Sequence, residues 1–138
     1  MSATRADWTL QIDLASLAET EAELERFLVD AGVNGTPSFV VTMVFEEMGR
    51  NLVEHSGAGA GDTLTVTAVV DFDVVTIVME DDQAPFDPLD DSGFDPESPL
   101  AERRAGGMGL HLVRQMATTL QYERRGDRNV LTATVARG

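Results

Sequence analysis

The sequence predicts an α/β protein of the α+β type, a two-layer sandwich with a mixed, mostly antiparallel sheet covered on one face by helices. The hydrophobic patterns follow the order β-α-α-β-β, a long polar segment, then α-β-β, with no repeated βαβ unit. Short connections at 71–73 and 126–127 indicate two antiparallel hairpins. With 138 residues, 43% of them hydrophobic, the chain can bury one core, so residues 1–138 are expected to form a single domain.

Composition excludes several kinds of function. The formal net charge is −14, from 24 acidic and 10 basic residues, which argues against a nucleic-acid partner because counterion release needs clustered Lys and Arg. The absence of cysteine excludes disulfides, thiolate metal sites and a thiol nucleophile. The first residues lack an apolar signal region and no apolar run is long enough to cross a bilayer, so a cytoplasmic protein without a membrane partner is expected.

The N-terminal part predicts a strand followed by two helices. Trp8 to Leu14 alternates apolar and polar residues, as a strand does. Ser16 is a candidate helix cap, with Glu19 completing a capping box, and this helix is expected to stop near Gly32. The dipeptide at 36–37, Thr-Pro, predicts the cap and first turn of the next helix.

The helix over 39–55 carries the side chains that are the strongest candidates for catalysis or metal binding. One i,i+4 row predicts a core seam: Val40, Val44, Met48 and Leu52. The neighbouring row carries polar groups at the edge of that seam: Met43, Glu47, Asn51 and His55. A carboxylate so placed could accept a proton and an amide oxygen could ligate Mg²⁺. The alternative is the half-exposed polar margin of an ordinary amphipathic helix.

The middle of the chain predicts a hairpin and then a long connection. Thr63–Val70 and Val74–Glu80 are expected to pair, with Leu64, Val66, Ala68 and Val70 on one face. From Gln83 to Arg104 Pro, Asp and Ser dominate, and a connection of this length is typical of a functional lid, placed at about 83–105, or of disorder. Its aspartates lack the register of an EF-hand, which argues against calcium.

The C-terminal part begins with a cluster of glycines at 106–109. Glycines that open a helix let phosphates approach the backbone N–H groups, although glycine also simply begins and ends helices. Four residues then follow a helical period: Leu110, Val113, Ala117 and Leu120. Leu120–Arg124 and Asn129–Val135 predict the second hairpin.

Three separated motifs together resemble the histidine-kinase-like ATPase superfamily, whose nucleotide-binding domain is the Bergerat fold. They are Glu47-x-x-x-Asn51 with His55, Asp81-x-x-x-x-Phe86-Asp87-Pro88, and the run GGMGLHLVR at 106–114, with 129–132 as the kind of strand that closes these domains. The resemblance spans residues 8 to 135, and within the superfamily it is greatest to the serine/threonine kinases of bacterial anti-sigma-factor systems.

The resemblance implies a role for each matching position. Glu47 is expected to be the general base that activates a serine or threonine hydroxyl, and Asn51 to hold Mg²⁺ at the phosphates of ATP. Asp81 is expected to read the adenine, and Arg103 or Arg104 to face the terminal phosphate. The residues expected to bind the nucleotide are Asn51, Asp81, Arg104, Gly106, Gly107, Gly109, Leu110 and Thr132.

The resemblance also implies partners. Proteins of this class bind a sigma factor or similar regulator and phosphorylate an antagonist of the anti-sigma factor; a homodimer is a further expected assembly. One position departs from the family, because Gln83 stands where the adenine motif Asp-x-Gly has glycine, and its side chain must point away or crowd the pocket. The alternative function is therefore a binding module of the same fold without phosphoryl transfer.

Overall fold

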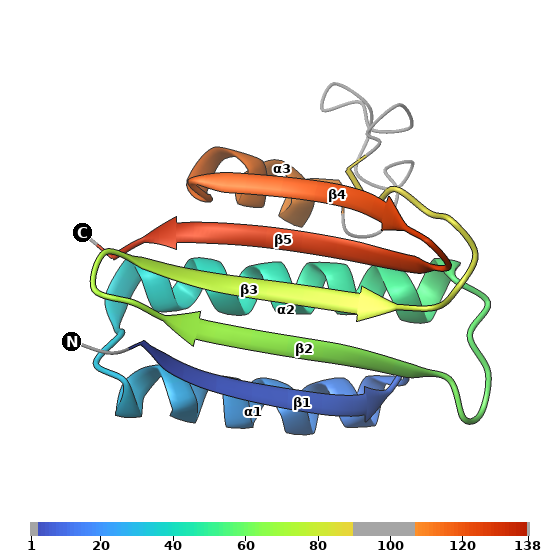
Figure 1. Cartoon of the computed structure of the whole chain (residues 1–138), viewed down its shortest axis with the longest axis horizontal. Coiled ribbons are helices and arrows are strands. Elements are labelled where there is room, and N and C mark those ends of the chain that lie inside the picture. The colour runs from blue at the N-terminus through green and yellow to red at the C-terminus, as the bar shows by residue number, and fades with distance from the viewer. Residues whose placement is uncertain (1–2, 90–106, 138) are drawn as a thin grey trace.

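The computed structural model describes residues 3–89 and 107–137 and has two layers (Figure 1). A five-stranded sheet forms one layer, and the three helices lie on one of its faces. The elements in chain order are β1 (Thr4–Gln11), α1 (Leu14–Asp30), α2 (Gly35–His55), β2 (Thr63–Val70), β3 (Val74–Asp81), α3 (Gly107–Met116), β4 (Thr119–Arg125) and β5 (Arg128–Ala136). The two-layer sandwich predicted from the order of patterns is confirmed.

The strand order is β1-β2-β3-β5-β4, and all four pairings are antiparallel. Both predicted hairpins, β2–β3 and β4–β5, are therefore confirmed. The two hairpins join through β3 and β5, where Ile77 lies opposite Ala133 and Asp81 opposite Asn129. This central pairing brings the ends of two distant hairpins together at one edge of the molecule.

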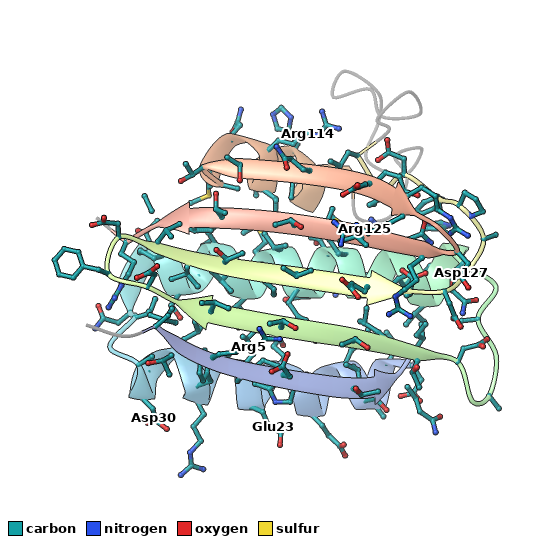
Figure 2. All side chains as sticks on the ribbon, viewed as in Figure 1. Arg5, Glu23, Asp30, Arg114, Arg125 and Asp127 are labelled. Atoms are coloured by element: carbon teal, nitrogen blue, oxygen red, sulfur yellow. The ribbon has the colours of Figure 1, made fainter. Side chains whose placement is uncertain are left out.

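The core lies between the sheet and the helices, with α2 contributing the most buried residues. The predicted inward face of β2, from Leu64 to Val70, is buried, as are Val40, Val44 and Met48 of the predicted seam on α2. The open face of the sheet is polar at its rim, where Arg5 pairs with Asp7 and Arg125 with Glu123 (Figure 2). No helix of the described residues is long and apolar enough to cross a membrane.

The first strand and helix differ from the sequence expectation. β1 runs from Thr4 to Gln11, earlier than the predicted 8–14, and α1 begins at Leu14. The cap is Asp13, whose Oδ1 accepts a hydrogen bond from the Ser16 backbone N–H at 2.7 Å. The prediction of Ser16 as the cap was wrong because an aspartate three residues earlier accepts its N–H. The predicted stop near Gly32 is confirmed.

Two further helix boundaries need correction. α2 begins at Gly35 after the cap residue Asn34, so the Thr-Pro dipeptide at 36–37 lies inside its first turn. α3 ends at Met116, and Leu120, predicted to continue its helical period, lies on β4. The chain leaves the helix because the N–H of Thr118 donates to the carbonyl of Thr134 in β5, which starts the sheet ladder.

Candidate active site

The polar row predicted on α2 lies at the edge of the core. Glu47 is 8% exposed and Asn51 6% exposed, whereas His55 at the end of the helix is exposed. The buried neighbours Val44 and Met48 on the adjoining row fix the orientation of the helix against the sheet. The carboxylate and the amide are therefore held by packing, one helical turn apart.

The buried negative charge of the Glu47 carboxylate is only partly offset by neighbouring groups. Its Oε2 is buried and has no hydrogen-bond partner among the described residues, and its Oε1 lies 4.0 Å from Nη1 of Arg50. Burial raises the pKa of Glu47, Arg50 opposes that shift, and the carboxylates of Glu46 and Glu54 add to it. A carboxylate whose pKa is raised is a stronger base when ionised, as general-base catalysis requires.

A mostly apolar pocket opens at the C-terminal end of β3 beside α2; we call it the Asp81 pocket. The residues that line it are Met48, Asn51, Leu52, Met79, Asp81, Phe86, Pro88, Tyr122, Asn129 and Leu131. The space between them is about 350 Å³ including the open mouth. Apolar walls with a few fixed polar groups are typical of small-molecule sites.

Asp81 is the buried acid of this pocket, and one of its oxygens is already bonded. Oδ1 accepts hydrogen bonds from the Gln83 N–H and from Nδ2 of Asn129, both at 2.9 Å. Oδ2 has no partner among the described residues. The carboxylate is therefore fixed in orientation with one acceptor oxygen left for a ligand that carries an amino group.

Asn129 organises the polar end of the pocket, and its role was not predicted from the sequence. Besides Asp81, its Nδ2 donates to the carbonyls of Gln83 and Ala84, while its Oδ1 accepts from the Tyr122 hydroxyl and from Arg124. Its position opposite Asp81 in the β3–β5 register places it there. The signal that could have identified Asn129 is a buried-face asparagine beginning a strand.

Gln83, the residue that departs from the family pattern, does not enter the pocket. Its side chain donates to Oδ1 of Asp82 at 3.3 Å, and it is absent from the pocket lining. Its backbone φ is not positive, so glutamine is accommodated without the conformation that would require glycine. Its carbonyl accepts from Nη1 of Arg124 at 2.8 Å, which holds this backbone in place.

The segment after β3 narrows the pocket. The Phe86 ring stacks on the His55 ring with centroids 6.2 Å apart and 25° between planes, and the Phe86 N–H donates to Oδ1 of Asn129 at 3.4 Å. Both Phe86 and Pro88 line the pocket and leave little open space within it. A flat aromatic ligand therefore requires this segment to move outward.

The other predicted site residues lie in different places. Thr132 alternates with the buried Leu131 and Ala133 on β5, so its side chain is on the opposite face of the sheet and the structure does not bring it into the Asp81 pocket. Gly107, Gly109 and Leu110 form the first turn of α3. The other predicted residues, Arg103, Arg104 and Gly106, and most of the predicted lid lie outside the described residues.

A metal ion would have few protein ligands here. Within residues 3–89 and 107–137, no group of three or more His, Asp or Glu side chains is close enough to hold one. Asn51 lines the pocket, and its side-chain amide has no hydrogen-bond partner in the described part of the chain. Asn51 thus fits a hard cation only if most of the ligands come from a bound molecule, as for Mg²⁺ on phosphates.

The sequence from residue 10 to 135 matches the family described as the histidine kinase-like ATPase domain. The chain belongs to this family, and the superfamily inferred from its motifs is confirmed. No curated protein matches it at a significant level.

Several solved structures share the fold. The RsbU and RsbW domains of Rv1364c from Mycobacterium tuberculosis match with a TM-score of 0.64 at 15% identity, over 98% of this chain and 33% of that one. The SiaB-SiaC complex from Pseudomonas aeruginosa matches with a TM-score of 0.57 at 15% identity, over 95% of this chain and 89% of that one. The histidine kinase AdeS of Acinetobacter baumannii gives 0.52 at 16% identity, over 100% of this chain and 70% of that one.

The present chain thus spans about a third of the length of the first of these structures. At 15–16% identity the three likenesses establish the fold alone. An ATPase domain of the histidine kinase-like family is the class of protein that the fold and the family match define.

Proposed function

We propose that this protein is an ATP-binding serine/threonine kinase of the anti-sigma-factor type, which sequesters a regulator and phosphorylates an antagonist protein. The observation that carries the proposal is the buried pair on α2, Glu47 and Asn51, beside a pocket that ends in the half-satisfied carboxylate of Asp81. These three groups supply a base, a metal oxygen and an acceptor for an amino group. That is the set an ATP-dependent phosphoryl transfer to a hydroxyl requires.

Each side chain has one task in this proposal. Oδ2 of Asp81 accepts a hydrogen bond from the exocyclic amine of adenine, and the adenine ring lies between the apolar walls of the pocket. The side-chain oxygen of Asn51 would hold Mg²⁺, which would stabilise the negative charge of the phosphates. Glu47 orients the acceptor hydroxyl and takes its proton, and its raised pKa makes the ionised carboxylate a stronger base.

Partner switching is supported by the fold neighbours. One of them contains an RsbW domain and another is a complex of SiaB with SiaC. For this chain we propose a sigma factor or similar regulator as one partner and an antagonist protein as the other, in a cytoplasmic setting, with a second copy of the chain as a further candidate partner.

Nucleotide binding is tested first, by thermal unfolding with and without ATP and Mg²⁺. A ligand at a hundred times its Kd adds about 2.7 kcal/mol to the free energy of unfolding, which shifts the midpoint by several degrees. Asp81→Asn should abolish the shift with ATP. Asn51→Ala should reduce the shift with ATP and Mg²⁺ more than the shift with ATP alone. Equal losses in both conditions would refute the metal role of Asn51.

The second candidate function is that of a binding module, which binds a partner protein without transferring phosphate to it. The narrow Asp81 pocket favours it, because Phe86 and Pro88 leave little room for a ring in this conformation. The discriminating measurement is transfer of labelled phosphate from ATP to the antagonist protein. A wild-type protein that binds ATP and the antagonist but transfers nothing supports the binding module and refutes the kinase.

A further inference from the structure

The row that contains Glu47 and Asn51 continues toward the N-terminus of α2 with two apolar residues. Phe39 and Met43 precede Glu47 at four-residue intervals, so all of them lie on one side of the helix. Phe39 is 55% exposed, which is unusual for a phenylalanine. The row therefore passes from the Asp81 pocket, past the carboxylate, to an exposed apolar end.

A groove lies between this end of α2 and α3; we call it the Glu47 groove. The residues that line it are Phe39, Thr42, Met43, Glu46, Glu47 and Leu112. Leu112 is 41% exposed, and Met116, one turn further along α3, is 37% exposed. The groove and the Asp81 pocket have no lining residue in common, although both are built on α2.

The Glu47 groove and the Asp81 pocket lie at different positions along the axis of α2. At about 1.5 Å per residue, Glu47 lies about 6 Å from Asn51 along the helix axis and Phe39 about 12 Å beyond Glu47. A molecule held at Asp81 and Asn51 is on one side of the carboxylate, and the groove is on the other. A hydroxyl that approaches Glu47 from the groove meets the carboxylate from the side opposite the pocket.

Charge restricts what the groove can hold. Of its six lining residues only Glu46 and Glu47 are charged, and the nearby Arg50 offsets one of them through its contact with Glu46 at 3.0 Å. The whole chain adds a net charge of −14. An acidic segment is repelled there, while an apolar segment without acidic residues covers Phe39 and Leu112 at no electrostatic cost.

We infer that the Glu47 groove docks the acceptor segment of the protein substrate, a stretch with a serine or threonine next to a bulky apolar side chain and without acidic neighbours. The inference rests on the proposed kinase function and adds the substrate class to it. The apolar neighbour packs between Phe39 and Leu112, and the hydroxyl then lies at the carboxylate of Glu47, which lines the groove. The contacts that select the substrate are thus separate from those that hold the nucleotide.

The test uses the full chain with a non-hydrolysable ATP analogue and Mg²⁺, titrated with two serine peptides that differ only in flanking residues, leucine in one and aspartate in the other. Amide NMR spectra follow binding residue by residue and measure affinities as weak as about 1 mM, which is about −4 kcal/mol. The leucine peptide should shift the amides around Phe39 and Leu112, and the aspartate peptide should not.

Matched variants make the test specific. Phe39→Ala and Leu112→Ala should each weaken binding of the leucine peptide about tenfold, from the apolar area that they no longer offer. Phe72→Ala is the control, because Phe72 is 69% exposed but lies on the β2–β3 turn, and it should leave the affinity unchanged. Equal effects of Phe39→Ala and Phe72→Ala, equal binding of both peptides, or no shift at these amides would each overturn the inference.

Failure of the groove and failure of the kinase give different results. The thermal shift with ATP and Mg²⁺ is measured on the same samples. If that shift is present and the leucine peptide does not bind, the groove inference alone is refuted. If the leucine peptide binds as expected while labelled ATP transfers no phosphate to it or to the antagonist, the groove remains a docking surface and the kinase proposal is refuted.

Discussion

Replacing Glu47 by glutamine should make the protein more stable at neutral pH. The folded state raises the pKa of Glu47, first by burial, above the ordinary value of 4.5 that applies to the unfolded chain. Below pH 4.5 both states hold the proton and the carboxyl costs little. As the pH rises through the raised pKa, the unfolded state is already ionised, so the folded state must accept a buried charge and loses stability relative to it.

The size of the gain follows from the burial of the side chain. Glu47 is 8% exposed with Oε2 unpartnered, and a buried polar group without a partner costs about 1–3 kcal/mol. Arg50 at 4.0 Å offsets a part, and the glutamine amide is itself polar, so the lower half of this range is expected. About 1–2 kcal/mol corresponds to a rise of about 3–6 °C in Tm for a chain of this size.

The assay is thermal unfolding of wild type and Glu47→Gln at several values between pH 4 and pH 7.5. The control is Glu23→Gln, which replaces an exposed carboxylate on α1 and should change Tm little at any of these pH values. The difference in Tm between Glu47→Gln and wild type should increase as the pH rises. A difference that is constant with pH, or a less stable variant at pH 7.5, would refute the account of Glu47 as a strained buried carboxylate.

The same substitution should reduce activity. Glutamine keeps the size and one acceptor but cannot take a proton, and a general base contributes about 10²–10⁴-fold to a rate. Transfer of phosphate to the antagonist protein should fall by that order, while ATP affinity is kept. A variant that is more stable and less active is the combination expected of a residue retained for chemistry. Unchanged turnover would show that Glu47 is not the base.

Three substitutions test the framework around the site. Asn129→Asp places a second carboxylate beside Asp81, so Tm should fall at neutral pH and recover on acidification; a pH-independent loss would mean that the amide acts by shape alone. Gly49→Val should cost about 1–3 kcal/mol in urea unfolding, because an added Cβ would lie 2.6 Å from a leucine methyl carbon of α1; no loss would show that this leucine moves aside. Asp13→Ala should lower Tm through loss of the α1 cap, whereas Ser16→Ala keeps the backbone donor and should not; the reverse order would restore Ser16 as the cap.

The hairpins and the buried faces could be predicted because their signals are local. The alternation of Leu64, Val66 and Ala68 fixes which face of β2 is buried without reference to any other element. The helix ends were harder to predict, because neighbouring residues compete for the same backbone groups. Asp13 and Ser16 are both residue types that cap helices well, and which of them caps α1 depends on where β1 ends.

The candidate active site could be predicted only in part. Glu47 and Asn51 are four residues apart on one helix, so the helical period brings them together. The contact of Asp81 with Asn129 depends on the β3–β5 register across 48 residues, which no local pattern specifies. Thr132 was predicted to bind the nucleotide from the strand motif, but side-chain alternation on β5 turns Asn129 inward and Thr132 outward.

The last hairpin also explains how the backbone at Gln83 is held without the glycine of the usual adenine motif. The carbonyl of Gln83 accepts hydrogen bonds from Arg124 and Asn129, and its N–H donates to Asp81. These three bonds hold the backbone in a conformation with φ below zero and leave the glutamine side chain directed toward Asp82. The position therefore does not require glycine, because two residues of the last hairpin fix the backbone that a glycine would otherwise leave free to adjust. Gln83→Gly should accordingly leave the ATP-dependent thermal shift nearly unchanged, and a large increase in that shift would show that the glutamine does obstruct the pocket.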